Sequence, residues 1–258
     1  MGLYSISVRG FEIGDLLVWA AQHAVPFVHL RGGPRGFDLA SRSTARLRHW
    51  HRLAQRTVPI TGVTADTDLA DLVSGEARTR RAACDQVHRL CEAACHLGAQ
   101  WVRLLARTPL THTSDPRLDY VLPDTALPLL VELHHARWLD PDAFTVLEAL
   151  MGRCGDLRLL ADTAQLGAAL AAGCDRGVAA AVLDRSNVLH LSDNGHGLAG
   201  ASHEEIATLA AHRLAQGQPM EVAMEWTGAD RCPETCLARY HSAVAWWSQI
   251  RARVEAVR

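Results

Sequence analysis

The sequence predicts one α/β domain over residues 1–258, folded as a (β/α)8 TIM barrel. Short runs with the composition of β-strands alternate with longer helical patterns from one end of the chain to the other. This alternation favours parallel strands joined by crossover helices, and eight such units in 258 residues match the usual size of the barrel. A doubly wound open sheet is the alternative. No linker, low-complexity stretch or change in composition indicates a second domain.

Eight short segments are predicted to be the strands of the barrel. They are rich in Leu, Val, Ile and aromatic residues, as buried parallel strands are. In chain order the predicted strands are residues 3–9, 26–32, 59–65, 100–106, 127–134, 156–163, 187–193 and 220–226.

Helical patterns lie between several of these strands, and a last helix closes the chain. Gly98 is expected to end one helix, because glycine readily adopts the left-handed conformation found there. Ser202 and Glu205 have the spacing of a capping box, which predicts the start of another helix. The predicted helices are residues 12–24, 43–56, 77–98, 202–217 and about 234–257.

Residues 107–126 form the longest irregular connection in the predicted barrel. This segment follows the fourth strand and is longer than the simple turns that usually join strands to helices. We therefore expect it to lie over the mouth of the barrel, either as a lid or as a short insertion.

The composition excludes several classes of function. All 26 basic residues are arginines, so lysine Schiff-base chemistry and the lysine of a phosphate-binding P-loop are both ruled out. The net charge of −2 gives no electrostatic basis for binding nucleic acid. No apolar run approaches the roughly 20 residues needed to span a membrane. Seven cysteines without a secretion signal predict reduced thiols and a cytoplasmic location.

Four polar residues occupy late positions in four consecutive predicted strands: Glu132, Asp162, His190 and Glu225. Each follows a run of apolar residues. Successive side chains of a strand point to opposite faces. By this rule Leu130 shares a face with Glu132, Leu160 with Asp162, Ser192 with His190 and Ala223 with Glu225. In TIM barrels, functional residues lie at the C-terminal ends of strands. We therefore expect the four side chains to point together into the barrel mouth.

Three carboxylates in one barrel mouth would repel one another unless a cation neutralises them. Three carboxylates and one imidazole form an oxygen-rich set of ligands, which suits Mn²⁺, Mg²⁺ or Co²⁺ better than a structural zinc ion. The sequence therefore predicts a site for one divalent metal ion. Mn²⁺ is favoured, with Co²⁺, Mg²⁺ and Zn²⁺ as alternatives.

The same region resembles a known family. The segments LLVELHH (129–135), LLADTAQLG (159–167), VLHLSDNGH (188–196) and EVAMEW (221–226) resemble the last four strands of the xylose isomerase-like TIM barrels. The most similar branch is that of the sugar phosphate isomerases and epimerases, including the ketose 3-epimerases. The segment HLGAQWVRLLA (96–106) also resembles the passage into the fourth strand of that branch.

The resemblance implies that Glu132, Asp162, His190 and Glu225 hold the metal ion. It also implies that Glu132 and Glu225 exchange protons with opposite faces of a substrate carbon. The expected activity is that of a metal-dependent isomerase or epimerase. Its expected substrate is a small polyhydroxylated or keto-sugar-like molecule that reacts through an enediolate.

Two positions depart from the family pattern at expected substrate contacts. Gln165 stands where the family commonly has a histidine, and His196 stands where many epimerases have an arginine. His134 has the parity to contact substrate, although a solvent-facing histidine is equally compatible with the sequence. These departures leave the metal site intact and leave the substrate open.

Two arginines are further candidates for substrate binding. Arg31 ends the second strand before the Gly-rich turn at 32–36, which either receives a phosphate or carboxylate or is a plain turn. Arg103 lies within the fourth strand, where an inward arginine needs an anionic partner. That partner is either Glu132 or the substrate, unless Arg103 points outward beneath a helix.

Other functions are compatible with the same residues. A lyase or dehydratase of specialised metabolism would use the same site, because an enediolate or enolate can also expel a hydroxyl group. A barrel that binds a metabolite without turnover is another alternative. A three-zinc DNA-repair endonuclease is disfavoured, because residues 59–65 supply no metal ligand. Trp246 and Trp247 indicate either packing onto the barrel or a homodimer contact.

Overall fold

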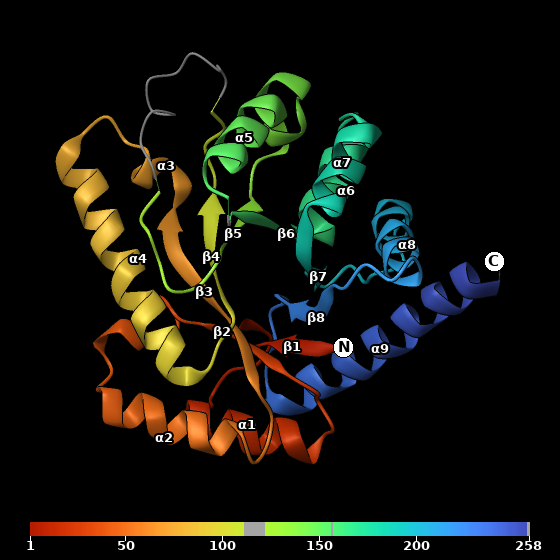
Figure 1. Cartoon of the computed structure of the whole chain (residues 1–258). Coiled ribbons are helices and arrows are strands. Elements are labelled where there is room, and N and C mark those ends of the chain that lie inside the picture. The colour runs from red at the N-terminus through yellow and green to blue at the C-terminus, as the bar shows by residue number, and fades with distance from the viewer. Residues whose placement is uncertain (111–121, 156, 257–258) are drawn as a thin grey trace.

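The computed structural model describes residues 1–110, 122–155 and 157–256. Eight parallel strands pair in sequence order, and β8 pairs with β1 to close the barrel (Figure 1). Helices surround the strands, and the last helix, α9, runs along the outside to the C-terminus. The predicted (β/α)8 barrel is confirmed, whereas the division of the chain into domains stays a prediction.

The strands agree closely with the predicted segments from the second strand onward. They are β1 (Gly2–Tyr4), β2 (Val28–Arg31), β3 (Ile60–Asp68), β4 (Trp101–Ala106), β5 (Leu129–Leu133), β6 (Arg158–Asp162), β7 (Ser186–Asp193) and β8 (Glu221–Trp226).

Among the described residues an α-helix follows every strand except β4, with two helices after β3 and two after β6. They are α1 (Ile13–Gln22), α2 (Thr44–Ala54), α3 (Leu69–Leu72), α4 (Ala77–Leu97), α5 (Pro141–Arg153), α6 (Thr163–Ala171), α7 (Arg176–Asp184), α8 (Ala201–Ala215) and α9 (Pro233–Ala256). Short 3-10 helices are η1 (Ser5–Ser7), η2 (Leu39–Ser41) and η4 (Ala136–Leu139).

A small apolar cluster fills the barrel below the candidate site. It consists of Trp101, Leu130, Leu160 and Val188, all of which are buried. The last three lie two residues before Glu132, Asp162 and His190 on their strands. Since side chains two residues apart point to the same face, the polar residues lie one layer further toward the C-terminal end.

The first strand is shorter than predicted. Residues 3–9 were expected to be extended, but β1 stops at Tyr4 and the chain enters η1. The hydroxyl of Ser5 accepts a hydrogen bond from the backbone of Arg31 at 2.9 Å, and that of Ser7 accepts one from Trp226 at 2.8 Å. These bonds attach η1 to the ends of β2 and β8. The predicted strand was therefore wrong from residue 5 onward.

One of the two predicted helix boundaries is confirmed. Gly98 ends α4 with φ of 80°, in the left-handed conformation that glycine favours. The capping box was wrong, because α8 begins at Ala201 after Gly200 and Ser202 lies inside the first turn. Glu205 pairs instead with Arg176, at 3.3 Å between Oε1 and Nε.

The connection predicted to be either a lid or a short insertion, residues 107–126, lies partly outside the described residues, which leave out 111–121. Helix α9 packs on the barrel through Trp247, which is buried, and Trp246, which is half-buried against the core. The packing alternative for this pair therefore holds, and a homodimer stays a prediction.

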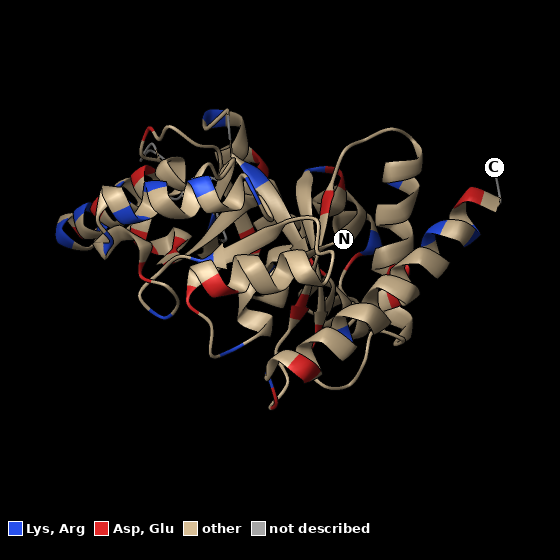
Figure 2. Cartoon of the chain, turned by 90° about the horizontal axis from the view of Figure 1, so that it is seen from below, with Lys and Arg blue, Asp and Glu red and all other residues tan. Residues whose placement is uncertain are grey.

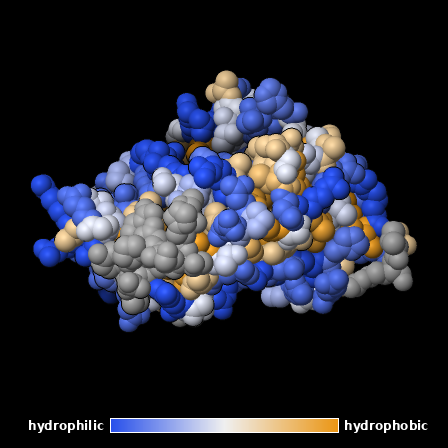
Figure 3. Space-filling model, turned by 90° about the horizontal axis from the view of Figure 1, so that it is seen from above, coloured by the Kyte–Doolittle hydropathy of each residue, from blue (hydrophilic) through white to orange (hydrophobic). Residues whose placement is uncertain are grey.

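The surface carries charges of both signs. Acidic and basic residues are interspersed along the helices and loops in Figure 2. The face shown in Figure 3 is mostly hydrophilic, with hydrophobic residues gathered near its centre. Among the described residues, the helices are either too short or too polar to cross a membrane.

Candidate metal centre

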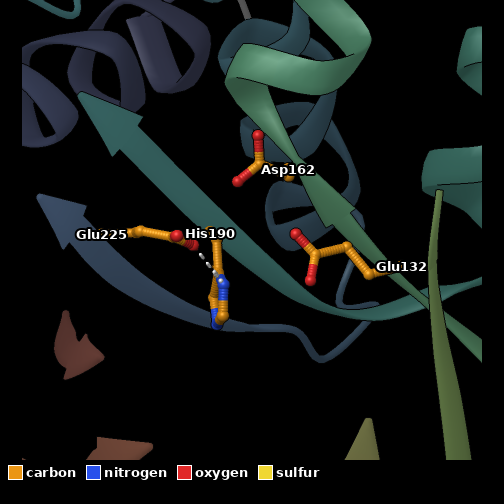
Figure 4. A group of neighbouring side chains, drawn as sticks. All are labelled: Glu132, Asp162, His190 and Glu225. Carbon is orange, nitrogen blue, oxygen red and sulfur yellow. Dashed lines mark hydrogen bonds and ion pairs between the residues drawn. The ribbon is translucent and has the colours of Figure 1, made fainter. Parts of the chain in front are cut away.

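Four polar side chains from β5, β6, β7 and β8 meet at one point in the barrel. Each of Glu132, Asp162, His190 and Glu225 offers one ligand atom, and these atoms all lie within 4.8 Å of one another. Figure 4 shows the three carboxyl groups and the imidazole directed toward a common centre. Among the residues that the structure describes, this is the one such group of acidic, His or Cys side chains.

The register of the strands explains why these side chains meet. Asp162 is paired directly with His190 across β6 and β7. Glu225 is paired with Ser192, two residues beyond His190 on the same face of β7. Glu132 is paired with Leu160, two residues before Asp162. The stagger of neighbouring strands in a closed barrel thus places the four positions around its mouth.

Glu132 is buried with two basic partners. Its Oε2 lies 2.8 Å from Nε of Arg103 and 3.2 Å from Nε2 of His134. Burial alone would raise the pKa of Glu132, but Arg103 and His134 outweigh it and hold this pKa at about 2. Arg103 therefore points into the barrel and has Glu132 as its anionic partner, which is one of the alternatives left open by the sequence. Its Nη1 donates to the carbonyl of Ala65 at 3.0 Å.

Asp162 and Glu225 lack such a cation. Burial and the repulsion of neighbouring carboxylates raise the pKa of each to about 7. Asp162 also caps helix α6, because its Oδ1 accepts a hydrogen bond from the backbone of Gln165 at 2.9 Å. Its Oδ2 accepts a hydrogen bond from the hydroxyl of Ser192. These two bonds orient the carboxyl group toward the centre of the cluster.

His190 belongs to a hydrogen-bonded chain that crosses the barrel. Its Nδ1 lies 3.0 Å from Oε2 of Glu225, and its Nε2 lies 3.1 Å from Nδ1 of His29. His29 continues through Nε2 to Oε2 of Glu221 at 3.1 Å. The ring of Tyr4 stacks on His190 with centroids 4.9 Å apart. Burial lowers the pKa of His190 to about 4, so its imidazole is neutral, as a metal ligand must be.

The cluster fits a divalent cation. Arg103 compensates the charge of Glu132, and a doubly charged ion would compensate those of Asp162 and Glu225. Two ligand atoms on opposite sides of one ion are separated by roughly 4 to 5 Å, and the four ligand atoms here all lie within 4.8 Å of one another. The raised pKa values of two buried carboxyl groups are the expected sign of a missing positive charge.

The other predicted substrate residues divide into two groups. His134 and Gln165 lie beside the cluster, with 3.4 Å between Nδ1 and Nε2. His196 is exposed in the turn after β7, and none of the described contacts joins its imidazole to the cluster. Arg31 lies outside the four-residue cluster and pairs with Asp66 at 3.2 Å.

Several residues of the site were not predicted. Ser192 entered the sequence analysis only as a neighbour on the face of His190, and Glu221 only within the segment 221–226. The contacts of Tyr4 and His29 with His190 were not predicted. A weak signal existed, because His29 and Glu221 are polar residues within otherwise apolar strands. Their partners come from distant strands, so the pairing itself required the fold.

Comparison with known proteins gives a structural match without a sequence match. No protein-family model matches the sequence, and no curated protein matches it. Solved structures match over nearly the whole chain. The fold is that of the xylose isomerase-like TIM barrels. The predicted resemblance is thereby confirmed at the level of the fold.

Three solved structures illustrate this likeness. An L-ribulose 3-epimerase has a TM-score of 0.71 at 12% identity, covering 99% of this chain and 95% of its own. A xylose isomerase-like TIM barrel protein from Mycobacterium smegmatis, in complex with magnesium, has 0.63 at 15%, covering 97% of both chains. The probable 3-DHS dehydratase of petrobactin synthesis from Bacillus anthracis has 0.61 at 15%, covering 94% of this chain and 98% of its own.

The first prediction concerns proton release when Mn²⁺ binds. With pKa values of about 7, Asp162 and Glu225 hold protons at lower pH that an ion must displace. Glu132 and His190 have pKa values of about 2 and about 4, so they contribute no protons near neutral pH. Affinity should therefore rise with pH up to about 7 and then level off, with about two protons released per ion near pH 6.

Calorimetric titrations with Mn²⁺ in two buffers of different ionisation enthalpy would measure this release. The number of protons should fall toward zero above about pH 8, where both carboxyl groups are ionised. An affinity that stays flat from about pH 6 to 8 would contradict the assignment of these carboxyl groups.

The second prediction concerns the contact between His29 and His190. Replacing His29 by Leu removes the hydrogen bond to Nε2 of His190, which orients that ring. Loss of such a supporting contact typically lowers metal affinity by about 10- to 100-fold. The matched control is His51→Leu, since His51 bonds the carbonyl of Leu97 outside the barrel. If H29L and H51L bind Mn²⁺ equally well, the His29 contact does not support the site.

Proposed function

We propose that this protein is a divalent-metal-dependent isomerase or epimerase of a small polyhydroxylated or keto-sugar-like substrate. The proposal rests on one observation: three carboxyl groups and a neutral imidazole converge at the C-terminal ends of four neighbouring strands. In this proposal Glu132, Asp162, His190 and Glu225 hold the ion, with Mn²⁺ as the favoured metal. The solved epimerases and the magnesium complex of the same fold support it.

When bound, the metal would polarise a substrate carbonyl and the neighbouring hydroxyl, which acidifies the adjacent C–H bond and favours an enediolate. Glu132 and Glu225 are the proposed acid and base. Their carboxyl groups approach the centre of the cluster from opposite sides in Figure 4. A proton removed by one and returned by the other to the opposite face of the same carbon would invert its configuration, and a proton returned to the neighbouring carbon of the enediolate would move the carbonyl group.

The surrounding side chains support this division of roles. Arg103 holds Glu132 in place through Oε2, so this carboxylate keeps one orientation. His134 reaches the same oxygen and is 28% exposed, which gives a proton on Glu132 a route to solvent. Ser192 and the backbone of Gln165 hold Asp162, which has no part in proton transfer in this scheme.

A lyase or dehydratase is the second candidate. It would use the same acid and base, and the carbanion or enediolate would then expel a neighbouring hydroxyl as water. The probable dehydratase of the same fold favours this alternative. Gln165 beside the cluster, in place of the family's histidine, also favours a substrate unlike those of the epimerases.

The third prediction tests catalysis through Glu132→Gln and Glu225→Gln. Each amide should bind Mn²⁺ more weakly but, at saturating Mn²⁺, should also lower turnover by about 10²- to 10⁴-fold, because an amide cannot accept a proton. The assay follows deuterium uptake from D2O into a panel of ketoses and keto-cyclitols. Mass spectrometry separates the two outcomes. An epimerase gives a deuterated product that keeps all its hydroxyl groups, and a lyase gives a product that has lost water.

Glu204→Gln is the matched control. Glu204 pairs with Arg253 on the outer surface between α8 and α9, so E204Q should keep full activity. Metal that binds in the wild type but supports no exchange with any panel member would favour the non-catalytic binding barrel. Activity that survives in both E132Q and E225Q would contradict the proposed acid and base.

A further inference from the structure

A second polar cavity opens at the same end of the barrel as the candidate metal centre. It has a volume of about 370 Å³ and is lined by residues that follow β1, β2 and β8. Five of its lining residues are arginines, which we call the arginine pocket: Arg9, Arg31, Arg35, Arg42 and Arg231. Glu12 is the acidic residue that lines it.

The arginine pocket contains more positive charge than its neighbouring carboxylates neutralise. Arg31 and Arg35 share a single carboxylate, since Oδ1 of Asp66 lies 3.2 Å and 2.8 Å from their respective Nη2 atoms. Arg42 donates through Nε to the carbonyl of Phe37 at 3.0 Å, which leaves its charge uncompensated by that contact. Two guanidinium groups on one carboxylate retain the capacity to bind another anion.

Arg231 is the clearest sign of a missing partner. Its Nη1 donates to the carbonyl of Ile6 at 3.1 Å, but its Nε is buried and lacks a hydrogen-bond partner among the described residues. Burial lowers the pKa of Arg231, and the neighbouring charges of Arg9 and Arg31 lower it further. A buried donor and mutually repelling cations both cost free energy that a bound anion would relieve.

The pocket also lies near the metal centre. Glu225 is close enough to raise the pKa of Arg231, against the effect of burial. The backbone of Trp226, the residue after Glu225, bonds to the hydroxyl of Ser7, and η1 forms part of the pocket wall. The wall of the arginine pocket is therefore joined to the strand that carries Glu225.

We propose that the arginine pocket binds an oxyanion carried by the substrate, either a phosphate ester or a carboxylate. The inference deepens the proposed function and rests on it, because it names the class of substrate: an anionic rather than a neutral polyhydroxylated molecule. Arginine suits both oxyanions, since its planar fork of donors matches their oxygen atoms.

Binding of simple anions tests the pocket without turnover. Inorganic phosphate and malonate are titrated into Mn²⁺-loaded protein and followed by calorimetry. Arg231→Gln and Arg9→Gln should each weaken binding of the preferred anion by about tenfold to a hundredfold. The control is Arg251→Gln, since Arg251 pairs with Glu255 on α9, outside the pocket. Tighter binding of phosphate assigns phosphorylated substrates, and tighter binding of malonate assigns acids.

Arg9 is exposed, so R9Q keeps the test valid even if R231Q fails to fold. The inference is overturned if neither phosphate nor malonate binds, or if the wild type, R9Q and R231Q bind the preferred anion equally well. The outcome is separate from that of the proposed function, because anion binding needs no catalysis. An active enzyme that prefers neutral ketoses and binds no anion would contradict only the inference about the arginine pocket. Anion binding without any turnover would contradict only the proposed activity.

For an anionic substrate that is turned over, the same variants give a second readout. R231Q and R9Q should raise KM by about tenfold or more with little change in kcat, because the pocket holds a part of the substrate remote from the reacting carbon. An equal loss of kcat with unchanged KM would overturn the assignment.

Discussion

Repulsion among three carboxyl groups in the barrel mouth is the constraint on which the rest of the site depends. Arg103 from β4 neutralises the charge of Glu132, so this buried carboxylate stays ionised without a metal ion. Asp162 and Glu225 have no equivalent partner, and their pKa values rise to about 7. Two uncompensated acidic groups beside a neutral imidazole form an arrangement that a divalent cation completes in charge and in ligands.

The barrel makes this arrangement possible by separating its interior into layers. The apolar layer of Trp101, Leu130, Leu160 and Val188 closes the interior beneath the polar residues. The chain from Glu221 through His29 then crosses the barrel to hold His190 from the side away from Glu225. The side chains of the candidate metal centre are thus held by packing from below and by hydrogen bonds from one side. The arginine pocket lies at the same end of the barrel.

Sequence reasoning predicted what depends on local periodicity. The two-residue period of strands and the late positions of Glu132 and Asp162 were enough to predict that the polar residues converge. It could not predict the pairing of His29 with Glu221, because their neighbours are set by closure of the barrel. The early end of β1 and the start of α8 were mispredicted for a related reason. The hydrogen bond that the Ser5 hydroxyl accepts from the backbone of β2 is a tertiary contact that no local pattern reveals.

The most direct test of the central claim is a crystal structure of the protein grown with Mn²⁺, with anomalous data collected near the manganese absorption edge. The account predicts one strong anomalous peak within coordination distance, about 2.0 to 2.6 Å, of Glu132, Asp162, His190 and Glu225. Well-ordered side chains around an empty centre, or a peak bound elsewhere, would contradict it. The four residues would then form a polar cluster with no ion between them, in which Asp162 and Glu225 are the groups that take up protons.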